Sequence, residues 1–210
     1  MNAAQLISGL RYRFEHKGPI TTLSMAMSYA LRYIYYRLKY GTSAPRPAEI
    51  IEVKPEHIEF LITPSELRGH FGEVPRYRVL GGEWDQLKSR FDSHLVHQSF
   101  VEHFSKGVPW EETTYHAYLQ DHPTRETTEL SQYEDLYENI KHNGYNKSYP
   151  IEVHIGRDGE LIRYDGSHRL SIAKILDLDR ISAKVLIRHS QYQTDPTVSI
   201  PTIKREETAT

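Results

Sequence analysis

Five consecutive residues, Asp165-Gly166-Ser167-His168-Arg169, have the types and the order to bind an anion. Gly166 lets the backbone approach a ligand closely. If a helix begins near Ser167, its first amides lack partners within the helix and carry the positive end of its dipole. A phosphate there would meet these amides, the Ser167 hydroxyl, His168 and the planar fork of Arg169. The alternative is structural: Ser167 caps the helix and Arg169 pairs with a surface carboxylate.

A second chemical candidate is the run Gly81-Gly82-Glu83-Trp84-Asp85, in which a double glycine precedes two carboxylates. If this run folds over the elbow at Gly166, Glu83 or Asp85 would join Asp165 as catalytic residues. Such carboxylates bind Mg²⁺ or accept a proton from an acceptor hydroxyl. The alternative is that the double glycine is a turn and Trp84 is a core anchor.

Three histidines, His94, His97 and His103, lie in a segment with a helical pattern. The His-x-x-His spacing of the first two would place both rings on one helix face, where they could bind a metal ion. No acidic third ligand stands out nearby. The sequence favours the alternative, in which these histidines lie on the helix surface.

The elements that position the elbow follow from periodicity. Residues 151–155 alternate apolar and polar, which predicts a half-buried strand. Arg157-Asp158-Gly159 predicts a tight turn, because Asp-Gly supplies positive φ. Residues 160–164 return as a second strand, a helix begins near Ser167, and alternation resumes at residues 183–187. The elbow therefore joins a strand to a helix.

The remaining elements are less regular. Apolar periodicity and breaker residues predict two short strands within 49–62, a short strand at 77–80, and helices at Asp85–Phe104, Trp110–Tyr118 and Ser131–Asn143. Ser131 followed by Glu134 is a capping-box signal for the last helix.

This order resembles the ParB/sulfiredoxin superfamily over residues 131–189. Its members carry a helix ending in glycine, a strand, a hairpin, a G-x-H/R-R elbow, a helix and a closing strand. The corresponding features here are Leu136–Asn143 with Gly144, the elbow 166–169, and Ile181-Ser182-Ala183-Lys184-Val185. The resemblance implies an α+β domain with a ParB/sulfiredoxin-like mixed small sheet. Its core would be 131–189 within a domain of 48–190, with a helical insertion at about 85–130.

The resemblance also implies chemistry. Family members bind nucleotide triphosphates through this elbow: ParB proteins use CTP, sulfiredoxins use ATP, and a serine-kinase branch transfers phosphate from a nucleotide. The Asp-Gly-x-His-Arg form led by Asp165 is similar to the kinase branch. Ser167 stands where sulfiredoxins have their reactive cysteine, and the chain has no cysteine, which excludes that redox chemistry. ParB proteins usually have Glu and Arg where Ser167 and His168 stand.

The first 47 residues differ in charge from the rest. They carry seven basic side chains and one acidic one, a net charge of +6; the formal total of −2 leaves −8 for residues 48–210. Pro19–Tyr40 is apolar and aromatic, with basic residues in its second half, and 41–47 is a linker by composition. One interpretation is a basic amphipathic helix on an anionic membrane surface. The other, which the irregular polar face favours, is a helix docked on the domain or on a second subunit.

The sequence as a whole favours an enzyme that transfers a phosphoryl group from ATP or another nucleotide to a small acceptor. Gly166–Arg169 would hold the phosphates, and Asp165 would bind Mg²⁺ or take the proton. The alternative is a non-enzymatic, nucleotide-gated or DNA-associated binding module, although the acidic domain argues against DNA unless a local basic patch overrides it. We expect a cytoplasmic location. Residues 10–40 would contact either a membrane surface or a second copy of the chain. Residues 191–210 are expected to be a mobile tail.

Overall fold

The computed structural model describes residues 18–47, 49–72, 76–122 and 129–194. In these ranges the chain forms a seven-stranded mixed sheet and helices, so the α+β prediction is confirmed. The strands are β1 Ile50–Val53, β2 Phe60–Leu61, β3 Arg78–Leu80, β4 Ser89–Arg90, β5 Ile151–Ile155, β6 Leu161–Asp165 and β7 Ile181–His189. The α-helices are α2 Pro19–Tyr40, α3 Pro64–Phe71, α4 Leu95–Phe100, α5 Thr114–Asp121, α6 Glu129–Asn143, α7 Ser167–Ile175 and α8 Ser190–Thr194.

The sheet is built around the three strands that flank the elbow. The strand order is β1-β7-β5-β6-β2-β4, and β3 also pairs with β7. β5 and β6 form an antiparallel hairpin, and β7 returns parallel to β5 through α7. The hairpin turn is closed by Gly156, which donates its N–H to the Glu160 carbonyl at 3.0 Å, and Gly159 has the positive φ (82°) expected of Asp-Gly. The predicted elements of 151–189 are therefore confirmed.

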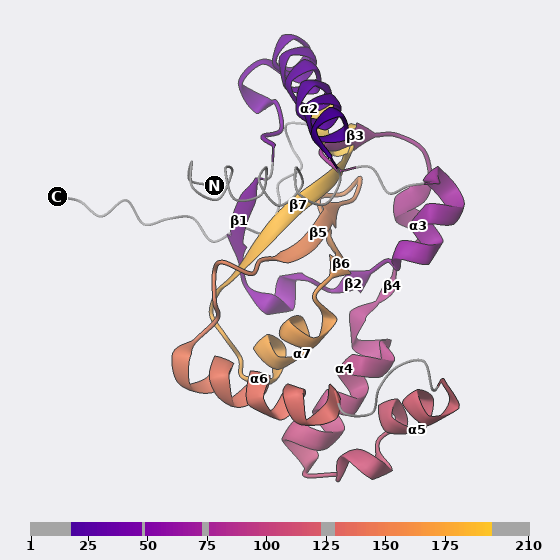
Figure 1. The fold of residues 1–210 in the computed structure, drawn as a ribbon, viewed down its shortest axis with the longest axis vertical. Coiled ribbons are helices and arrows are strands. Elements are labelled where there is room, and N and C mark those ends of the chain that lie inside the picture. The colour runs from indigo at the N-terminus through magenta and orange to yellow at the C-terminus, as the bar shows by residue number, and fades with distance from the viewer. Residues whose placement is uncertain (1–17, 48, 73–75, 123–128, 195–210) are drawn as a thin grey trace, which may run out of the picture.

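Alternation along β6 separates two apolar layers. Leu161 packs with Leu170 and Ala173 of α7 on one face of the sheet. Ile162 packs with Trp84 on the other face. A separate aromatic and aliphatic cluster joins α7 to the helices α4 to α6; its buried members include Phe100, Trp110, Tyr115, Leu119, Tyr133 and Ile172. These helices gather at the end of the molecule opposite α2 (Figure 1).

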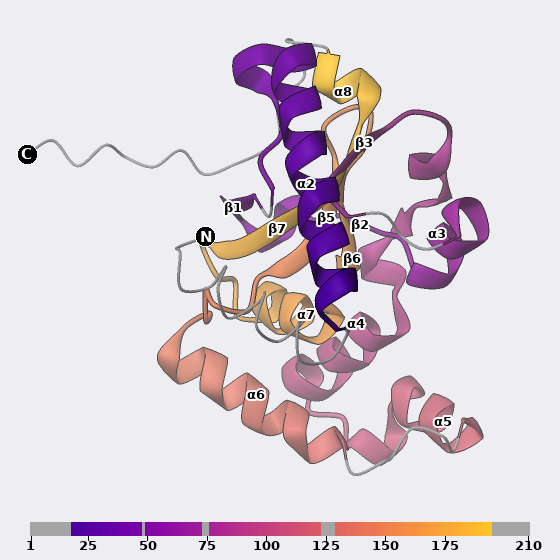
Figure 2. The same ribbon diagram turned by 45° about the horizontal axis from the view of Figure 1, so that its top comes forward.

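Helix α2 docks on the domain through tyrosines. Tyr29 stacks on Tyr77 at 5.7 Å between ring centroids, and Tyr36 meets the same ring edge-on at 5.6 Å. The Tyr36 hydroxyl accepts a hydrogen bond from the Val79 N–H at 2.9 Å. Figure 2 shows α2 lying along the domain near β3. No helix in the described ranges has both the length and the apolar character needed to cross a bilayer.

The single helix predicted at Asp85–Phe104 is wrong in its first half. The chain instead forms a 3₁₀ turn at Trp84–Leu87, strand β4, a 3₁₀ turn at Phe91–Ser93, and only then α4 and a π-helical turn at Val101–Ser105. β4 pairs with β2, and the Phe91 N–H donates to the Glu59 carbonyl at 2.8 Å. These contacts with a distant segment override the local helical pattern.

Two smaller predictions are also refined. The predicted helix at Trp110–Tyr118 is a 3₁₀ turn at Trp110–Glu112 followed by α5. The expected tail begins with an ordered helix, α8, in which Gln193 donates to the Ser43 carbonyl at 2.6 Å. Residues 195–210, the rest of the predicted tail, lie outside the described residues.

Candidate functional site

The elbow joins β6 to α7 at Gly166, whose backbone is left-handed with φ 94° and ψ 32°. The Leu170 N–H makes the first helical bond, to the Gly166 carbonyl at 3.0 Å, so the amides of residues 167–169 precede the helical hydrogen-bond series. A Cβ on Gly166 would lie 3.2 Å from Nη2 of Arg169 and 3.4 Å from Ile151. The left-handed backbone therefore favours glycine here, and a Cβ would also press on the end of the Arg169 side chain.

The side chains of His168 and Arg169 are both held by contacts with other elements. His168 stacks on Tyr133 at 4.3 Å and on Phe100 at 5.6 Å, inside the helical cluster. Arg169 donates from Nη1 to the carbonyls of Tyr149 and Pro150, which fastens the strand entry of β5 to α7. Gly166 and Ser167 stand at the start of α7, where the sequence predicted a helix start. Arg169 keeps its guanidinium beside Gly166, whereas the His168 ring packs into the helical cluster.

The structure does not bring Glu83 and Asp85 to the elbow. The Asp85 carboxylate is fully buried and accepts three hydrogen bonds from Arg157, at 2.7 to 3.0 Å, while Glu83 is exposed and lies 3.0 Å from the same guanidinium. Burial alone would raise the pKa of Asp85, but the bonds from Arg157 outweigh it and lower the pKa below its ordinary value.

Arg157 belongs to the hairpin turn, beside the pair Ile155 and Leu161, whereas Asp165 pairs with Glu152 at the other end of the strands. A five-residue strand separates the two ends by roughly 16 Å. The prediction that Glu83 and Asp85 act with Asp165 is therefore wrong, because both lie beside Arg157 at the other end of the hairpin. Asp85 is also buried and held there by its hydrogen bonds with Arg157. The alternative holds: Gly82 has a positive φ of 91° and Trp84 is fully buried.

A different set of polar groups lies along one face of α7. Lys174 of α7 lies over the Phe91 ring at 5.6 Å and 3.6 Å from Asp92, so the α7 face that carries Lys174 is turned toward the 3₁₀ turn before α4. Ser171 shares that face at helical spacing. We call this group the polar seam; it consists of His94, His97, Arg163, Ser171 and Lys174.

Most of the seam is buried without hydrogen-bond partners. Within the described part of the chain, Nδ1 of His94, Nδ1 of His97, Oγ of Ser171, and both Nε and Nη2 of Arg163 are buried and unpaired. Native proteins rarely leave buried polar groups in this state, so each calls for a ligand, a water molecule or another explanation. Other buried unpaired atoms lie elsewhere, among them both ring nitrogens of His154 and Nε1 of Trp110; the seam differs in that it contains a buried guanidinium.

Arg163 is the most unusual member of the seam. It is 5% exposed, lies over the Phe91 ring at 5.8 Å, and donates from Nη1 to the Tyr164 carbonyl at 3.0 Å. That bond places the guanidinium at the end of β6 from which α7 starts. Burial lowers the pKa of Arg163 to about 10, against the charges of Asp165 and Glu66, which raise it. The group remains charged at neutral pH, with no ion pair in the described ranges.

The two imidazoles of the seam are neutral at neutral pH. Burial, with the nearby charge of Arg163 and His97, lowers the pKa of His94 to about 4. Burial and Lys174 lower the pKa of His97, which Asp92 raises in part. A neutral imidazole can both donate and accept a hydrogen bond, so these rings can serve a ligand without adding charge.

The favoured prediction, that the three histidines lie on the helix surface, is wrong for His97, which is buried, while His94 is half-buried. His103 stacks on Trp110 at 4.1 Å, and its Nδ1 lies 2.8 Å from the Val108 carbonyl. Across the described residues, no three His, Asp or Glu side chains are grouped so as to hold a metal ion.

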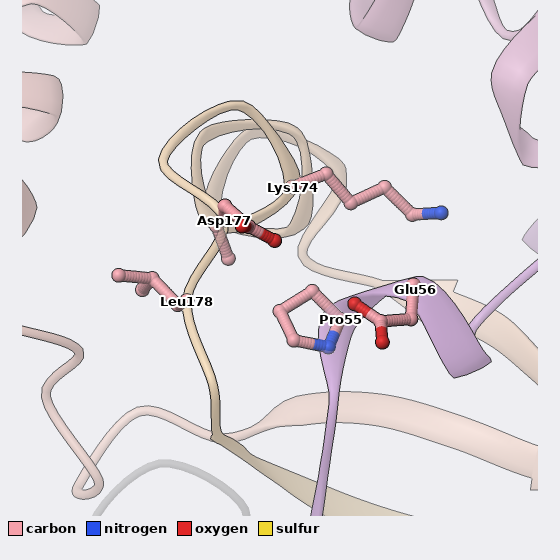
Figure 3. Close-up of a pocket in the computed structure, with 6 residues that line it drawn as sticks. Pro55, Glu56, Lys174, Asp177 and Leu178 are labelled. Carbon is pink, nitrogen blue, oxygen red and sulfur yellow. The ribbon is translucent and has the colours of Figure 1, made fainter.

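A hollow of about 180 Å³ opens at the far end of α7 (Figure 3). Its lining is Pro55, Glu56, Ala173, Lys174, Asp177 and Leu178. Sites for whole cofactors and drug-sized ligands usually exceed about 300 Å³. The hollow is therefore too small for a nucleotide, and two of its three charged groups are acidic.

Comparison of the chain with protein-family models, with curated proteins and with solved structures finds no match. The site rests on the geometry of this chain. Arg163 was not among the phosphate ligands predicted from the sequence, where it belonged only to the local basic patch considered for DNA. A signal exists: Arg163 lies two residues after the buried Leu161, at an inward position of a strand, where charged side chains are unusual.

Buried neutral histidines predict a defined loss of stability in acid. The pKa of His154, fully buried against Trp84 and Tyr164, is lowered by burial to about 3, while that of the unfolded side chain is about 6.5. The unfolded chain therefore binds more protons between these values, so this stability is present above pH 6.5 and is lost as the pH falls toward 3. We expect His154→Leu to reduce the slope of unfolding free energy between pH 6 and 4 by about 1.4 kcal/mol per pH unit in urea titrations. The exposed His142, changed to Leu, should leave the slope unchanged; equal slopes for the parent and His154→Leu would refute the assignment.

Proposed function

We propose that this chain binds a phosphate-bearing ligand at the elbow, between the first amides of α7 and the buried guanidinium of Arg163. The observation that carries the proposal is the unpaired Nε and Nη2 of Arg163. These two nitrogens form one edge of the guanidinium, the edge that grips two oxygens of a phosphate or carboxylate at once. The start of a helix alone binds many different anions weakly. A buried, unpaired arginine beside it would favour an anion that presents two oxygens to the guanidinium.

The energetics favour a ligand over a purely structural role. Taking a charged group out of water costs several kcal/mol unless a counter-charge and hydrogen bonds offset it. Asp85 and Arg157 show that this chain satisfies a buried charge fully where only structure is at stake. Arg163 has one backbone acceptor and an aromatic face instead. An incoming oxyanion would supply the missing counter-charge.

The nature of the ligand follows from the resemblance. We propose a nucleotide, with ATP foremost, and a ParB/sulfiredoxin-like domain to hold it. The order of α6, β5, β6, the elbow, α7 and β7 supports this fold. The exposed Asp165 lies at the end of β6, beside the proposed phosphate position.

The proposed reaction is transfer of the terminal phosphoryl group to a hydroxyl of a small acceptor. The acceptor oxygen bonds to phosphorus as the bridging P–O bond breaks, Asp165 takes the hydroxyl proton, and the nucleoside diphosphate leaves. If Mg²⁺ takes part, Asp165 would give it one carboxylate oxygen and the phosphates would give others, with metal charge stabilising the phosphates. Arg163 would hold the phosphates and not exchange protons.

The binding step is tested by replacing Arg163 with Met, which has a similar length and no charge. Because the charge is unpaired, removing it should leave the free energy of unfolding the same or higher. The affinity for ATP, measured by calorimetry, should fall at least tenfold, the scale of one lost charge-assisted pair. The exposed Arg90, changed to Met, is the matched control and should leave the affinity unchanged. Destabilised protein with intact affinity would make Arg163 structural.

The transfer step is tested by Asp165→Asn. Asn tolerates the same turn but lacks charge and basicity, so fold and most nucleotide affinity should persist. Turnover should fall by about 10²-fold or more, the usual contribution of a positioned acid or base. Full turnover in the Asn variant would remove Asp165 from the chemistry. Nucleotide binding by the parent protein without turnover on a broad acceptor panel would favour the nucleotide-gated binding module.

A further inference from the structure

Helix α2 exposes a continuous row of aliphatic side chains that nothing in the described structure covers. The exposed fractions of these residues range from 54% to 84%. We call the row the α2 stripe; it consists of Ile20, Leu23, Met27, Leu31, Ile34 and Leu38. Isolated exposed apolar residues are ordinary, but an aligned set on one helix marks an interaction surface.

The orientation of the stripe is fixed by the domain. With 100° between successive residues, the six side chains fall within about 80° of one another, and Tyr29 and Tyr36 fall on the opposite side. Those tyrosines dock α2 through Tyr77, and Arg32 adds a bond to the Arg76 carbonyl at 3.0 Å. The domain therefore holds the stripe facing outward, away from β3.

The spacing of the stripe suits a flat surface. The steps between its residues are 3, 4, 4, 3 and 4; the two successive steps of 4 break the strict alternation of 3 and 4 that a heptad coiled coil with a second copy needs. The helix has 22 residues, a length of roughly 33 Å, so it offers a long, straight contact.

The charge identifies the surface. Helix α2 contains Arg32, Arg37 and Lys39 and no acidic residue. Arg37 lies at one border of the stripe and Tyr35 at the other; Lys39 lies beyond Tyr35, 5.8 Å over its ring and 5.2 Å over the Tyr40 ring. Cations at the borders of an apolar face, with tyrosine beside them, are arranged for lipid headgroups. Two copies pairing through this face would bring no acid to these cations.

From this arrangement we infer that α2 is a membrane-surface helix: its stripe enters the headgroup boundary of an anionic bilayer, and Arg37 and Lys39 bind lipid phosphates. The inference is independent of the elbow. The membrane-binding helix and the proposed phosphate site would then lie in different parts of the molecule. In Figure 1, α2 is at one end and the helices packed around α7 are at the other.

The test is sedimentation of the full chain with vesicles of phosphatidylcholine containing about one-third phosphatidylglycerol, and with vesicles of phosphatidylcholine alone. We expect binding to the anionic vesicles, at least tenfold weaker binding to the neutral ones, and a loss of affinity at about 0.5 M salt. Met27→Glu with Leu31→Glu should reduce binding at least tenfold with an unchanged melting temperature, since both side chains are exposed.

A matched control adds the same charge elsewhere. Leu87→Glu with Tyr149→Glu alters two exposed apolar residues outside the stripe and should sediment like the parent chain. Equal binding by the stripe variant and this control would overturn the inference. The inference would also be overturned if the parent chain bound neither kind of vesicle. If that chain were a dimer that the stripe variant dissociates, the stripe would bind a second copy of the chain instead of a membrane.

Discussion

A guanidinium buried without a hydrogen-bonded carboxylate is the constraint on which the arrangement of this site depends. Arg163 stands on the central hairpin, and its side chain occupies the space between the sheet and the helices α4 and α7. The imidazoles of His94 and His97 have lowered pKa values and are neutral, and the second cation of the seam, Lys174, lies 3.6 Å from Asp92. The seam thus keeps the buried charge of Arg163 among several unpaired polar atoms, where an oxyanion would be bound more strongly than in water.

The elbow completes this arrangement through its backbone. Gly166 turns the chain so that α7 begins beside the end of β6, and Arg169 and His168 hold that turn from both sides, one through the carbonyls before β5 and the other through Tyr133. In the proposed site, His168 and Arg169 would therefore support the turn, and Arg163, three positions upstream of the glycine, would supply the buried charge.

Local patterns were enough to predict the strands, the hairpin, the elbow and the helix of residues 151–189, because alternation, Asp-Gly and helical spacing act over a few residues. They failed where the partner is distant in sequence. Asp85 is held by hydrogen bonds from Arg157, and Phe91 by a backbone bond to Glu59. The periodicity of the surrounding sequence indicates neither of these contacts. Arg163 was predictable in principle as a charge at an inward position of β6. Its lack of a partner was not, since that depends on every element packed around it.

The most direct measurement is the side-chain Nε–H signal of Arg163 in nitrogen–proton correlation spectra of the full chain during titration with ATP. The account predicts that this signal shifts with saturation as the free Nε–H and Nη2–H groups grip the phosphates, while the Nε–H signal of Arg169, whose guanidinium is already held by carbonyls, shifts much less. An unchanged Arg163 signal at saturating ATP, or a shift confined to Arg169, would contradict it.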